Sequence, residues 1–377
     1  MSKGKTVLFL VRSVYSHPTG AYMVIFKLCE QMLIRGDHPA ILFVNGLNEN
    51  LLKIFPFKRE EVGLFSNKVH SIKYLTWKFL GTRFGFKLFM PILRLVKGYK
   101  LNGGLPKIKT FFSTSILKRY RFDVLIATNW QTAYMISGYK DKSKLCYFLQ
   151  VEEHNPLFSG KLSTLASNSY NLPMTKIVID SKMERFLSSF ESKRIHIGID
   201  HSIFYLRNKV DSRSNLVLLM LRVGSFKGAR LGIEAATILN ALNPNLNFIG
   251  VGDISIREVP KFIDFKGFVS TTMLAELYNQ AALLILPSLL ESWALPVLEA
   301  TACGCSVVAI DGVLDDSILD VSNVFLAEAD ANAIATVANE LIENKAMRIC
   351  HAQKGINKSK TFNYENMYNE FYKAIWD

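Results

Sequence analysis

Two glutamates, Glu291 and Glu299, stand eight residues apart in the stretch PSLLESWALPVLEATACGCSVVAID. Eight residues make a little over two helical turns, so the two carboxylates share a face if a helix runs between them. Pro296 suits the first turn of a helix, which predicts Glu291 in the preceding loop and Glu299 in that first turn. The spacing alone fits equally well a solvated loop acid followed by one acid near the positive end of a helix.

Basic side chains follow a different apolar run, LVLLML. The turn after it, RVGSFKGAR, contains Arg222, Lys227 and Gly228. At a strand-to-helix turn these bases could clamp a diphosphate, because a guanidinium contacts two oxygens at once while an ammonium adds positive charge. Two ordinary surface bases are the alternative interpretation. Gly20 opens the first predicted helix, where a glycine lets backbone N–H groups approach an anion.

Carboxylates and cations have complementary uses in one site. Carboxylates accept hydrogen bonds from sugar hydroxyls, whereas cations and helix N-termini bind phosphate. A site that combines them suits a nucleotide sugar, which carries both chemical groups. The sequence therefore predicts a nucleotide-sugar ligand, provided that the fold brings the two sets of residues together.

The elements that must position these residues alternate between apolar strands and amphipathic helices. In the first half, a helix is predicted over residues 23–33 and strands are predicted at Lys5–Val11, Ala40–Val44, Asp123–Thr128, Lys144–Gln150, Lys176–Ile179 and Arg194–Ile197. After the polar stretch Asp200–Asn215, the best candidate for a linker, the pattern restarts and ends with the strand CSVVAI.

Short apolar strands that alternate with helices indicate parallel sheets covered on both faces. We expect two doubly wound, Rossmann-like α/β domains, with a ligand cleft between them at the carboxyl ends of the strands. The predicted domains are residues 1–205, which would bind the acceptor, and residues 206–362, which would bind the nucleotide sugar. A C-terminal helix over residues 363–377 is expected to pack back on the first domain.

The composition is that of a globular protein. A chain of 377 residues, 49% hydrophobic and 20% charged, fits two domains and argues against extensive disorder. No apolar stretch is long enough to span a membrane, and the apolar run near the N-terminus indicates a first strand rather than a leader. The five cysteines lie in apolar segments and are expected to be buried thiols, which favours a cytoplasmic protein.

The excess positive charge is confined to one segment. The chain has a net charge of +13, and residues 53–121 contain sixteen Lys and Arg against two acids. Aromatic residues are interleaved with these bases, as expected of a segment that binds an anionic membrane surface. A solvated basic helix and a single-stranded nucleic-acid site are the alternatives. We expect the membrane rather than nucleic acid, which places the protein at the inner face of the membrane.

These motifs are similar to those of retaining glycosyltransferases of family 4 with the GT-B fold. The resemblance rests on PSLLESWALPVLEATACGCSVVA, LRVGSFKG, FIGVGD, FKGFVS and PTGAYMVIFKLCEQMLIRGDHP. The stretch YFLQVEEHNPLF further resembles a rhamnosyl-type subset of polysaccharide transferases. The similarity covers most of the second half, is patchy in the first half and does not extend to residues 45–121.

The resemblance implies a role for each matching residue. Glu299 would hold the donor ribose and Glu291 the donor sugar, while Arg222 and Lys227 would neutralise the diphosphate leaving group. The other donor-binding positions that it implies are Gly20, Gly228, Gly252, Ser292, Trp293, Ala294 and Leu295. This chain has Ser292-Trp293-Ala294 where the family commonly has Gly-Phe-Gly, so the bulky Trp293 is expected to affect the choice of donor sugar.

The resemblance also implies a reaction. Positive groups beside the β-phosphate would stabilise the charge that builds up as the anomeric bond breaks, with no metal or other cofactor and with retention of configuration. Glu152, Glu153 and His154 follow a predicted strand and are the candidates near the acceptor, although His154 could instead cap its loop.

The expected function is transfer of a hexose from a UDP-, GDP- or dTDP-linked donor to a glycan or lipid-linked glycan in cell-surface polysaccharide synthesis. Two other functions remain open at this point. One is a sugar-nucleotide epimerase of the same fold, and the other is a non-enzymatic basic protein that binds membranes or nucleic acid.

Overall fold

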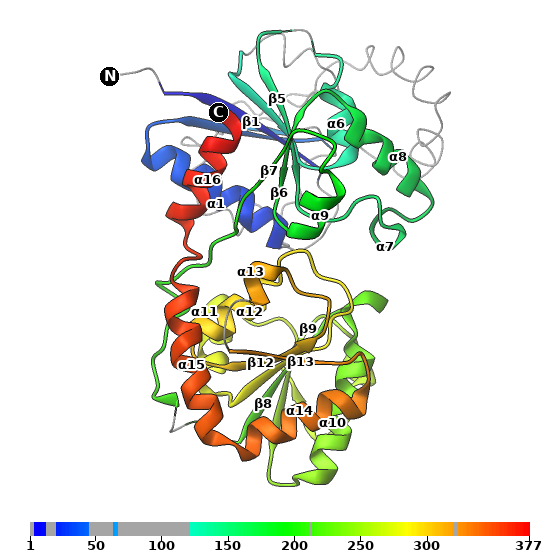
Figure 1. Ribbon diagram of the computed structural model, residues 1–377, viewed down its shortest axis with the longest axis vertical. Coiled ribbons are helices and arrows are strands. Elements are labelled where there is room, and N and C mark those ends of the chain that lie inside the picture. The colour runs from blue at the N-terminus through cyan, green and yellow to red at the C-terminus, as the bar shows by residue number, and fades with distance from the viewer. Residues whose placement is uncertain are drawn as a thin grey trace, which may run out of the picture. The chain divides into compact units, whose positions relative to one another are not determined.

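The computed structural model shows two compact units (Figure 1). The first comprises Met1–Ile179, Met183–Ile195 and Tyr368–Asp377, and the second comprises Asp180–Lys182 and His196–Met367. The structure describes residues 4–12, 20–44, 63–66, 121–139, 141–210, 213, 215–319 and 323–377. Almost all of the basic segment 53–121 therefore lies outside the described residues. The main division falls at residue 196, earlier in the chain than the predicted limit at 205.

The first unit is built on a seven-stranded parallel sheet with the strand order β3-β2-β1-β4-β5-β6-β7. Its strands are β1 Thr6–Val11, β2 His38–Phe43, β3 Gly63–Ser66, β4 Val124–Ala127, β5 Lys144–Leu149, β6 Thr175–Val178 and β7 Ser192–Arg194. The central strands β1 and β4 are buried along almost their whole length, as a parallel sheet covered on both faces requires. The sequence did not predict β3, and β7 ends where the predicted strand Arg194–Ile197 begins.

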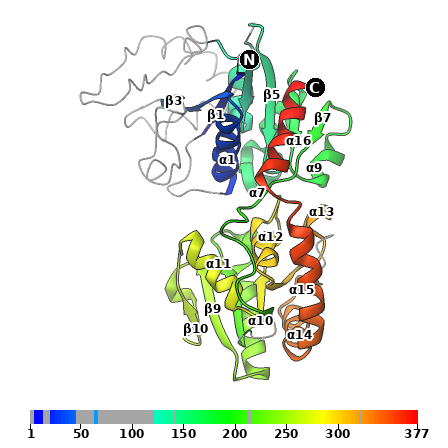
Figure 2. The ribbon, with the colours of Figure 1, turned by 90° about the vertical axis from the view of Figure 1, so that its left-hand side faces the viewer.

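The helices of the first unit are α1 Gly20–Ile34, α6 Trp130–Ile136, α7 Pro156–Ser159, α8 Ser163–Asn168, and most of α9 Ser181–Phe186 and of α16 Tyr364–Trp376. The C-terminal helix α16, drawn in red, lies beside the blue α1 (Figures 1 and 2). Phe371 of α16 stacks on Phe9 of β1 with 5.9 Å between ring centroids, and the Tyr368 hydroxyl donates to Asp37 at 2.9 Å. The end of the chain thus completes the core of the first unit.

The second unit has a six-stranded parallel sheet with the strand order β10-β9-β8-β11-β12-β13. Its strands are β8 Leu216–Leu221, β9 Asn247–Gly252, β10 Ile263–Phe265, β11 Leu283–Leu286, β12 Ser306–Ile310 and β13 Val324–Ala327. Its helices are α10 Ala229–Leu242, α11 Thr271–Gln280, α12 Leu295–Ala302, α13 Asp316–Leu319, α14 Ala331–Glu343 and α15 Lys345–Ser359. Two parallel sheets with alternating helices confirm the predicted fold class.

Two sequence predictions about the second unit were wrong. CSVVAI is not the last strand, because β13 follows it; β13 is an edge strand of only four residues, VFLA, and a run that short is a weak strand signal although it is apolar. Cys350 is exposed whereas the other four cysteines are buried, because Cys350 lies on the outer side of α15.

The strand order of the second sheet positions its candidate site. β8 lies between β9 and β11, so the chain winds to one side of β8 and then to the other. Leu218 of β8 is paired with Ile249 of β9 and with Leu284 of β11. In open α/β sheets, ligands bind where the winding direction changes, at the carboxyl ends of the strands. The loops after β8 and β11 are therefore the place to look for a ligand.

Candidate active site

The loops after β8 and β11 lie side by side because the two strands are neighbours. The first loop passes through a 3-10 turn, Ser225–Lys227, before α10 begins. The backbone N–H of Leu289 in the second loop donates to the carbonyl oxygen of Phe226 at 2.8 Å, which ties the loops together. The structure thereby brings together Lys227 and Glu291, which the sequence had assigned to two different parts of a donor.

Lys227 and Glu291 form an ion pair between these loops. The Nζ atom lies 2.7 Å from Oε1, and the two side chains are only 19% and 15% exposed. Partial removal from solvent strengthens the attraction and makes each charge depend on its partner. The ammonium also lies over the Phe226 ring, 5.3 Å from its centroid. The pair can bind a phosphate through Lys227 and accept a hydrogen bond from a hydroxyl through Glu291.

Two of the predicted ligand-binding glycines are required by the packing of the backbone. Gly228 is left-handed with φ 63°, and a Cβ there would lie 1.9 Å from the carbonyl oxygen of Pro287. Gly252 has φ 150°, and a Cβ there would lie 1.7 Å from the carbonyl oxygen of Leu221. Both conformations and both close approaches exclude a side chain. Packing alone is enough to explain why these residues are glycines.

Arg222 directly follows β8 and is partly exposed. The next residue, Val223, donates its N–H to a carboxylate oxygen of Asp253 at 2.6 Å, which fixes the backbone where Arg222 leaves the sheet. This role of Asp253 was not predicted, although the motif FIGVGD places the residue immediately after Gly252. Arg222 therefore belongs to the same edge of the sheet as Lys227, on a backbone that Asp253 holds.

The start of α12 has a backbone conformation that is unfavourable for its sequence. Ala294 has φ 45° and ψ 55° and is the one non-glycine residue with positive φ in the described part of the chain. A left-handed alanine costs roughly 1–2 kcal/mol. No side chain caps this helix, and the N–H of Val297 already bonds to the carbonyl of Ala294 at 2.9 Å. The N-terminus of α12 thus begins in the loop that follows β11, and the N–H groups of a helix N-terminus suit an anion.

The side chain of Trp293, which was expected to affect the choice of donor sugar, is buried. Its indole is 4% exposed, and its Nε1 donates to the carbonyl oxygen of Ile197 at 3.0 Å. The ring also meets His196 and Phe362 edge-on, with centroid distances of 5.6 and 5.9 Å. The indole is therefore an interior group of the second unit. The backbone of Trp293 and the partly exposed residue Ser292 are left to contact a donor.

Glu299 lies in the second turn of α12, not in the first as predicted, because the helix begins at Leu295. Its side chain keeps partial exposure, yet the surrounding protein removes enough water to raise the pKa of its carboxyl to about 7, while the nearby Tyr278 hydroxyl lowers it. Tyr278 is fully buried, and its hydroxyl has no hydrogen-bond partner of ordinary geometry among the described residues. The sequence does not mark Tyr278 as a site residue, because it is one of the apolar positions that bury α11.

Glu153 is an interior residue of the first unit, 7% exposed. Its carboxylate accepts a short hydrogen bond from the Tyr147 hydroxyl and another from the backbone N–H of Trp130 at 3.2 Å. Burial raises the pKa of Glu153 to about 7, and these two hydrogen bonds lower it. Glu153 thus holds the loop after β5 against the start of α6, which is a structural task for a residue that was predicted near the acceptor.

His154 packs on an aromatic neighbour. Its imidazole stacks parallel to the Phe186 ring at 4.2 Å between centroids, and its backbone N–H donates to the Tyr170 hydroxyl at 3.0 Å. These contacts fix the loop, while the imidazole and the side chain of Glu152 keep partial exposure. Of the three residues predicted near the acceptor, only Glu152 and His154 can meet a ligand.

The remaining predictions concern the start of the first helix, metal binding and membrane-spanning helices. Gly20 is the exposed first residue of α1, as predicted, and residues 13–19 before it lie outside the described residues. Within the described ranges, no group of three or more His, Cys, Asp or Glu side chains could hold a metal ion. Across the same ranges, no helix combines the length and the apolar character needed to cross a membrane.

Known proteins resemble both halves of the chain. Residues 206–358 match the family described as Glycosyl transferases group 1. O-antigen chain mannosyltransferase B from Escherichia coli is 27% identical over 105 residues, which cover 28% of this chain and 28% of that protein. Sucrose-phosphate synthase from Thermosynechococcus elongatus has a TM-score of 0.73 at 15% identity, and Anabaena HepE with UDP and glucose has 0.72 at 16%. Each structural match covers 98% of both chains.

These comparisons define the class of the fold. The whole chain has the GT-B fold, and the domain at residues 206–358 matches the glycosyltransferase group 1 family. The domain contains Arg222, the Lys227–Glu291 ion pair and Glu299. Together, fold and domain support a glycosyltransferase.

Proposed function

We propose that the protein is a retaining, metal-independent glycosyltransferase that moves a hexose from a nucleotide sugar to a glycan or lipid-linked glycan. The Lys227–Glu291 ion pair carries this proposal. It places a cation 2.7 Å from a carboxylate at the carboxyl ends of two neighbouring parallel strands. In a nucleotide sugar the diphosphate and the sugar hydroxyls are adjacent, so a single ligand can bind both members of the pair.

The rest of the donor has partners on the same edge of the sheet. Arg222 would add a second cation for the diphosphate, and the backbone at Ala294 and Leu295 would supply N–H donors. Glu299 would accept hydrogen bonds from the ribose hydroxyls, which favour the ionised form of a carboxyl whose pKa burial has raised. HepE was solved with UDP, so a UDP-linked donor is the first to test, before GDP- and dTDP-linked ones.

The reaction follows from where these charges are fixed. As the anomeric bond breaks, negative charge builds up on the β-phosphate, and a cation already in place stabilises it without reorganisation. Glu291 would hold Lys227 in this position while it accepts a hydrogen bond from the donor sugar. The acceptor hydroxyl would attack from the face that the leaving group vacates, and its proton would pass to the departing phosphate. No protein nucleophile takes part.

The acceptor is the less defined half of the proposal. The matched Escherichia coli protein acts on an O-antigen chain, which supports a glycan acceptor in cell-surface polysaccharide synthesis. Glu152 and His154 are the candidates to contact that acceptor. We further propose that the enzyme works in the cytoplasm at the inner face of the membrane, where lipid-linked glycans and nucleotide sugars meet.

The test is a donor screen followed by product analysis. Thermal shift with UDP, GDP, dTDP and their sugars should identify one nucleoside diphosphate that stabilises the protein. After transfer to a glycan acceptor, NMR of the product should show the same anomeric configuration as in the donor. The rate of transfer should be the same with and without EDTA. An inverted product would refute retention, and loss of activity in EDTA would refute metal independence. Conversion of the donor sugar without an acceptor would replace the transferase with an epimerase.

A further inference from the structure

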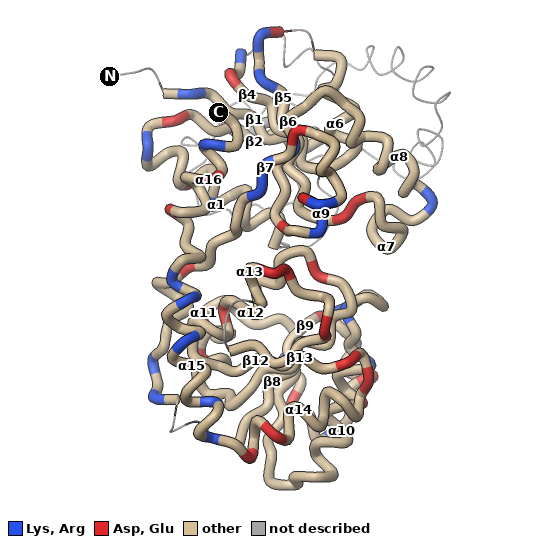
Figure 3. The backbone as a smooth tube through the Cα atoms, viewed as in Figure 1, with Lys and Arg blue, Asp and Glu red and all other residues tan. Residues whose placement is uncertain are grey.

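One stretch of the second unit, α15 with the residues next to it, has basic residues and no acidic ones. Residues 344–364 contain five Lys and Arg and no Asp or Glu, while the rest of this unit has ten Lys and Arg against nineteen Asp and Glu. Figure 3 shows the blue positions gathered along α15. A basic stretch on an otherwise acidic unit marks this side of the unit as a candidate contact for an anionic partner.

The lysines of α15 lie on its outer side. Arg348, the arginine of α15, is instead buried, and its guanidinium donates to the carbonyl oxygens of Leu341 and Ile342. The inner face consists of Ala352, Gly355, Ile356 and Ser359, which are buried against the unit. Lys345, Lys354 and Lys360 are exposed and Lys358 is partly exposed. Three lysines of α15, and Lys360 directly after its last residue, therefore contact solvent.

An apolar groove adjoins the C-terminal end of this helix. It has a volume of about 240 Å³ and is lined by His201, Tyr205, Leu206, Ala302, Ile356, Ser359 and Lys360. Tyr205 is 46% exposed, and the guanidinium of Arg207 lies 5.0 Å from the centroid of its ring. One surface therefore combines lysines, an arginine, an exposed aromatic ring and an apolar depression.

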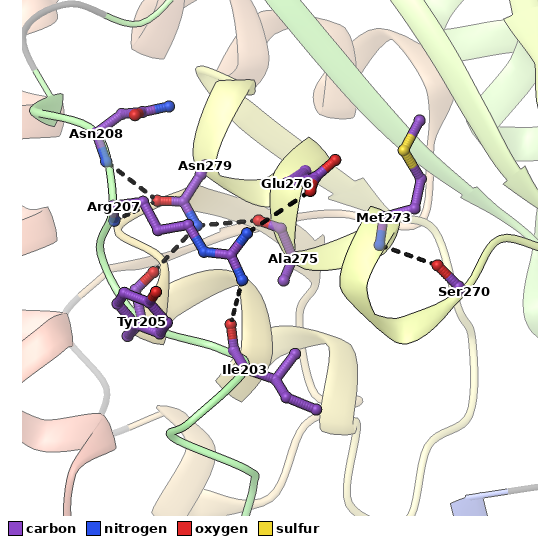
Figure 4. Close-up of polar contacts among 9 residues, drawn as sticks. All are labelled: Ile203, Tyr205, Arg207, Asn208, Ser270, Met273, Ala275, Glu276 and Asn279. Carbon is purple, nitrogen blue, oxygen red and sulfur yellow. Dashed lines mark hydrogen bonds and ion pairs between the residues drawn. The ribbon is translucent and has the colours of Figure 1, made fainter.

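The loop that contains Tyr205 is held in place by hydrogen bonds to Asn279 of α11 (Figure 4). The side chain of Asn279, buried in α11, accepts from the backbone N–H of Arg207 at 2.7 Å and donates to the carbonyl oxygen of Tyr205 at 3.0 Å. The guanidinium of Arg207 also donates to the carbonyl oxygen of Ile203 at 3.1 Å. The exposed ring of Tyr205 is thus presented on a fixed backbone although its segment of sequence has no regular pattern.

We propose that α15 and the Tyr205 loop form a docking surface for an anionic lipid bilayer. Lysines along a helix match a plane of phosphate headgroups, because each ammonium is a point charge that needs no fixed partner geometry. An amphipathic aromatic ring beside an apolar depression suits the boundary between headgroups and acyl chains. A bilayer supplies both the anionic plane and the apolar depth. This surface lies in the second unit and is separate from the basic segment 53–121.

Cys350 offers a local reporter of this contact. It is the only exposed cysteine of the five in the chain, so an environment-sensitive dye can be attached to it in the otherwise unchanged protein. Cys350 and Lys354 are four residues apart on α15 and share a face of the helix. A reference dye is attached at position 261 in a protein with Lys261→Cys and Cys350→Ser. Figure 2 shows α15 and β10, which Lys261 precedes, on opposite sides of the second unit.

The experiment adds vesicles of phosphatidylcholine and phosphatidylglycerol in equal parts to the labelled full-length protein. The dye on Cys350 should shift to the blue, the shift should weaken as salt is raised, and the dye at position 261 should not respond. Changing Lys354, Lys358 and Lys360 to Gln should weaken the apparent vesicle affinity about 100-fold at low salt. Changing Arg257, Lys261 and Lys266 to Gln, which removes the same charge from the other side of the unit, should leave it unchanged.

Three outcomes would overturn the proposal. Sedimentation with the vesicles and an unchanged dye on Cys350 would show that another surface meets the membrane. Equal loss of affinity in both triple variants would show that only net charge matters. An equal dye response to single-stranded RNA at the same salt would identify a general polyanion site. Tyr205→Ser should reduce binding that remains at high salt, and normal thermal unfolding of each variant excludes a folding defect as the cause.

Discussion

Glu153 in the first unit and Glu299 in the second have carboxyls whose pKa is raised to about 7 by the same cause, the loss of solvent. They differ in what surrounds the oxygens. Glu153 accepts from Tyr147 and from the Trp130 N–H and is 7% exposed, whereas Glu299 has the Tyr278 hydroxyl beside it and keeps partial exposure. A raised pKa therefore locates burial, and the exposure that remains distinguishes a carboxyl that can meet a ligand from an interior one.

The same contrast applies to the neighbours of each carboxyl. Near Glu153 the polar groups are partnered within the first unit: the Tyr147 hydroxyl lies 3.2 Å from Ser169, whose own hydroxyl donates to a backbone carbonyl. On the candidate site of the second unit, a cation and a carboxylate that both keep some exposure form an ion pair across two loops. A ligand can enter the second arrangement by exchange of partners, but it could enter the first only by breaking the interior.

The largest expected effect tests the exchangeable pair. Lys227→Ala should lower kcat/KM for transfer by 10²- to 10³-fold, because one fixed charge beside the developing phosphate charge is lost. Arg230→Ala is a matched control, since Arg230 is a cation of the same unit with a 93% exposed side chain paired to Glu234. Steady-state kinetics and thermal unfolding of both variants provide the measurement. Wild-type turnover in Lys227→Ala would remove this residue from the site.

The second effect concerns the interior carboxyl. Folding raises the pKa of Glu153 from 4.5 to about 7, so between these values the folded protein binds more protons than the unfolded chain. Stability from this group is therefore fully present below pH 4.5 and is lost as the pH rises to about 7. The loss is on the order of 3 kcal/mol. Urea unfolding at several pH values should show this slope in the wild-type protein.

The control for that slope is Glu153→Gln, which keeps the shape and removes the titration. The variant should unfold with a flatter dependence on pH across the same interval. A slope that is unchanged in Glu153→Gln would assign the proton uptake to another group, of which Glu299 is the first candidate.

The third prediction separates the two carboxyls by binding. Glu299→Gln should weaken the affinity for the matching nucleoside diphosphate by about 10- to 100-fold, the value of a hydrogen bond to a charged group. Glu153→Gln should leave that affinity unchanged because its oxygens are occupied inside the first unit. Isothermal titration calorimetry measures both. If the two variants bind the nucleoside diphosphate equally well, the different surroundings of the two carboxyls do not identify the ribose site.

Sequence was enough to predict that Arg222, Lys227 and Glu291 lie at one edge of the second sheet, where the candidate site is. Glu291, Arg222 and Lys227 follow apolar runs, and parallel strands bring such positions to one edge. It could not show that Trp293 is anchored by the carbonyl of Ile197, because that partner is 96 residues away in the chain. Nor could spacing distinguish Glu153 from Glu152, since both follow the same strand and only burial separates them.

The smallest expected effect concerns strain beside the candidate site. Around Glu153 the described backbone has no non-glycine residue with positive φ, whereas Ala294 near Glu299 has φ 45°. Glycine adopts this conformation without the Cβ clash, but it also gains more freedom in the unfolded chain. Ala294→Gly should therefore raise the free energy of unfolding by no more than about 1 kcal/mol.

Gly228 provides the opposite test, because it is also left-handed but closely packed. Gly228→Ala adds a Cβ that would lie 1.9 Å from the carbonyl oxygen of Pro287, so it should destabilise the second unit strongly. Urea unfolding of the two variants should shift in opposite directions. A loss of stability in Ala294→Gly would mean that the Ala294 methyl contributes more by packing than its left-handed backbone costs. In that case the strain beside Glu299 would no longer distinguish the candidate site from the interior around Glu153.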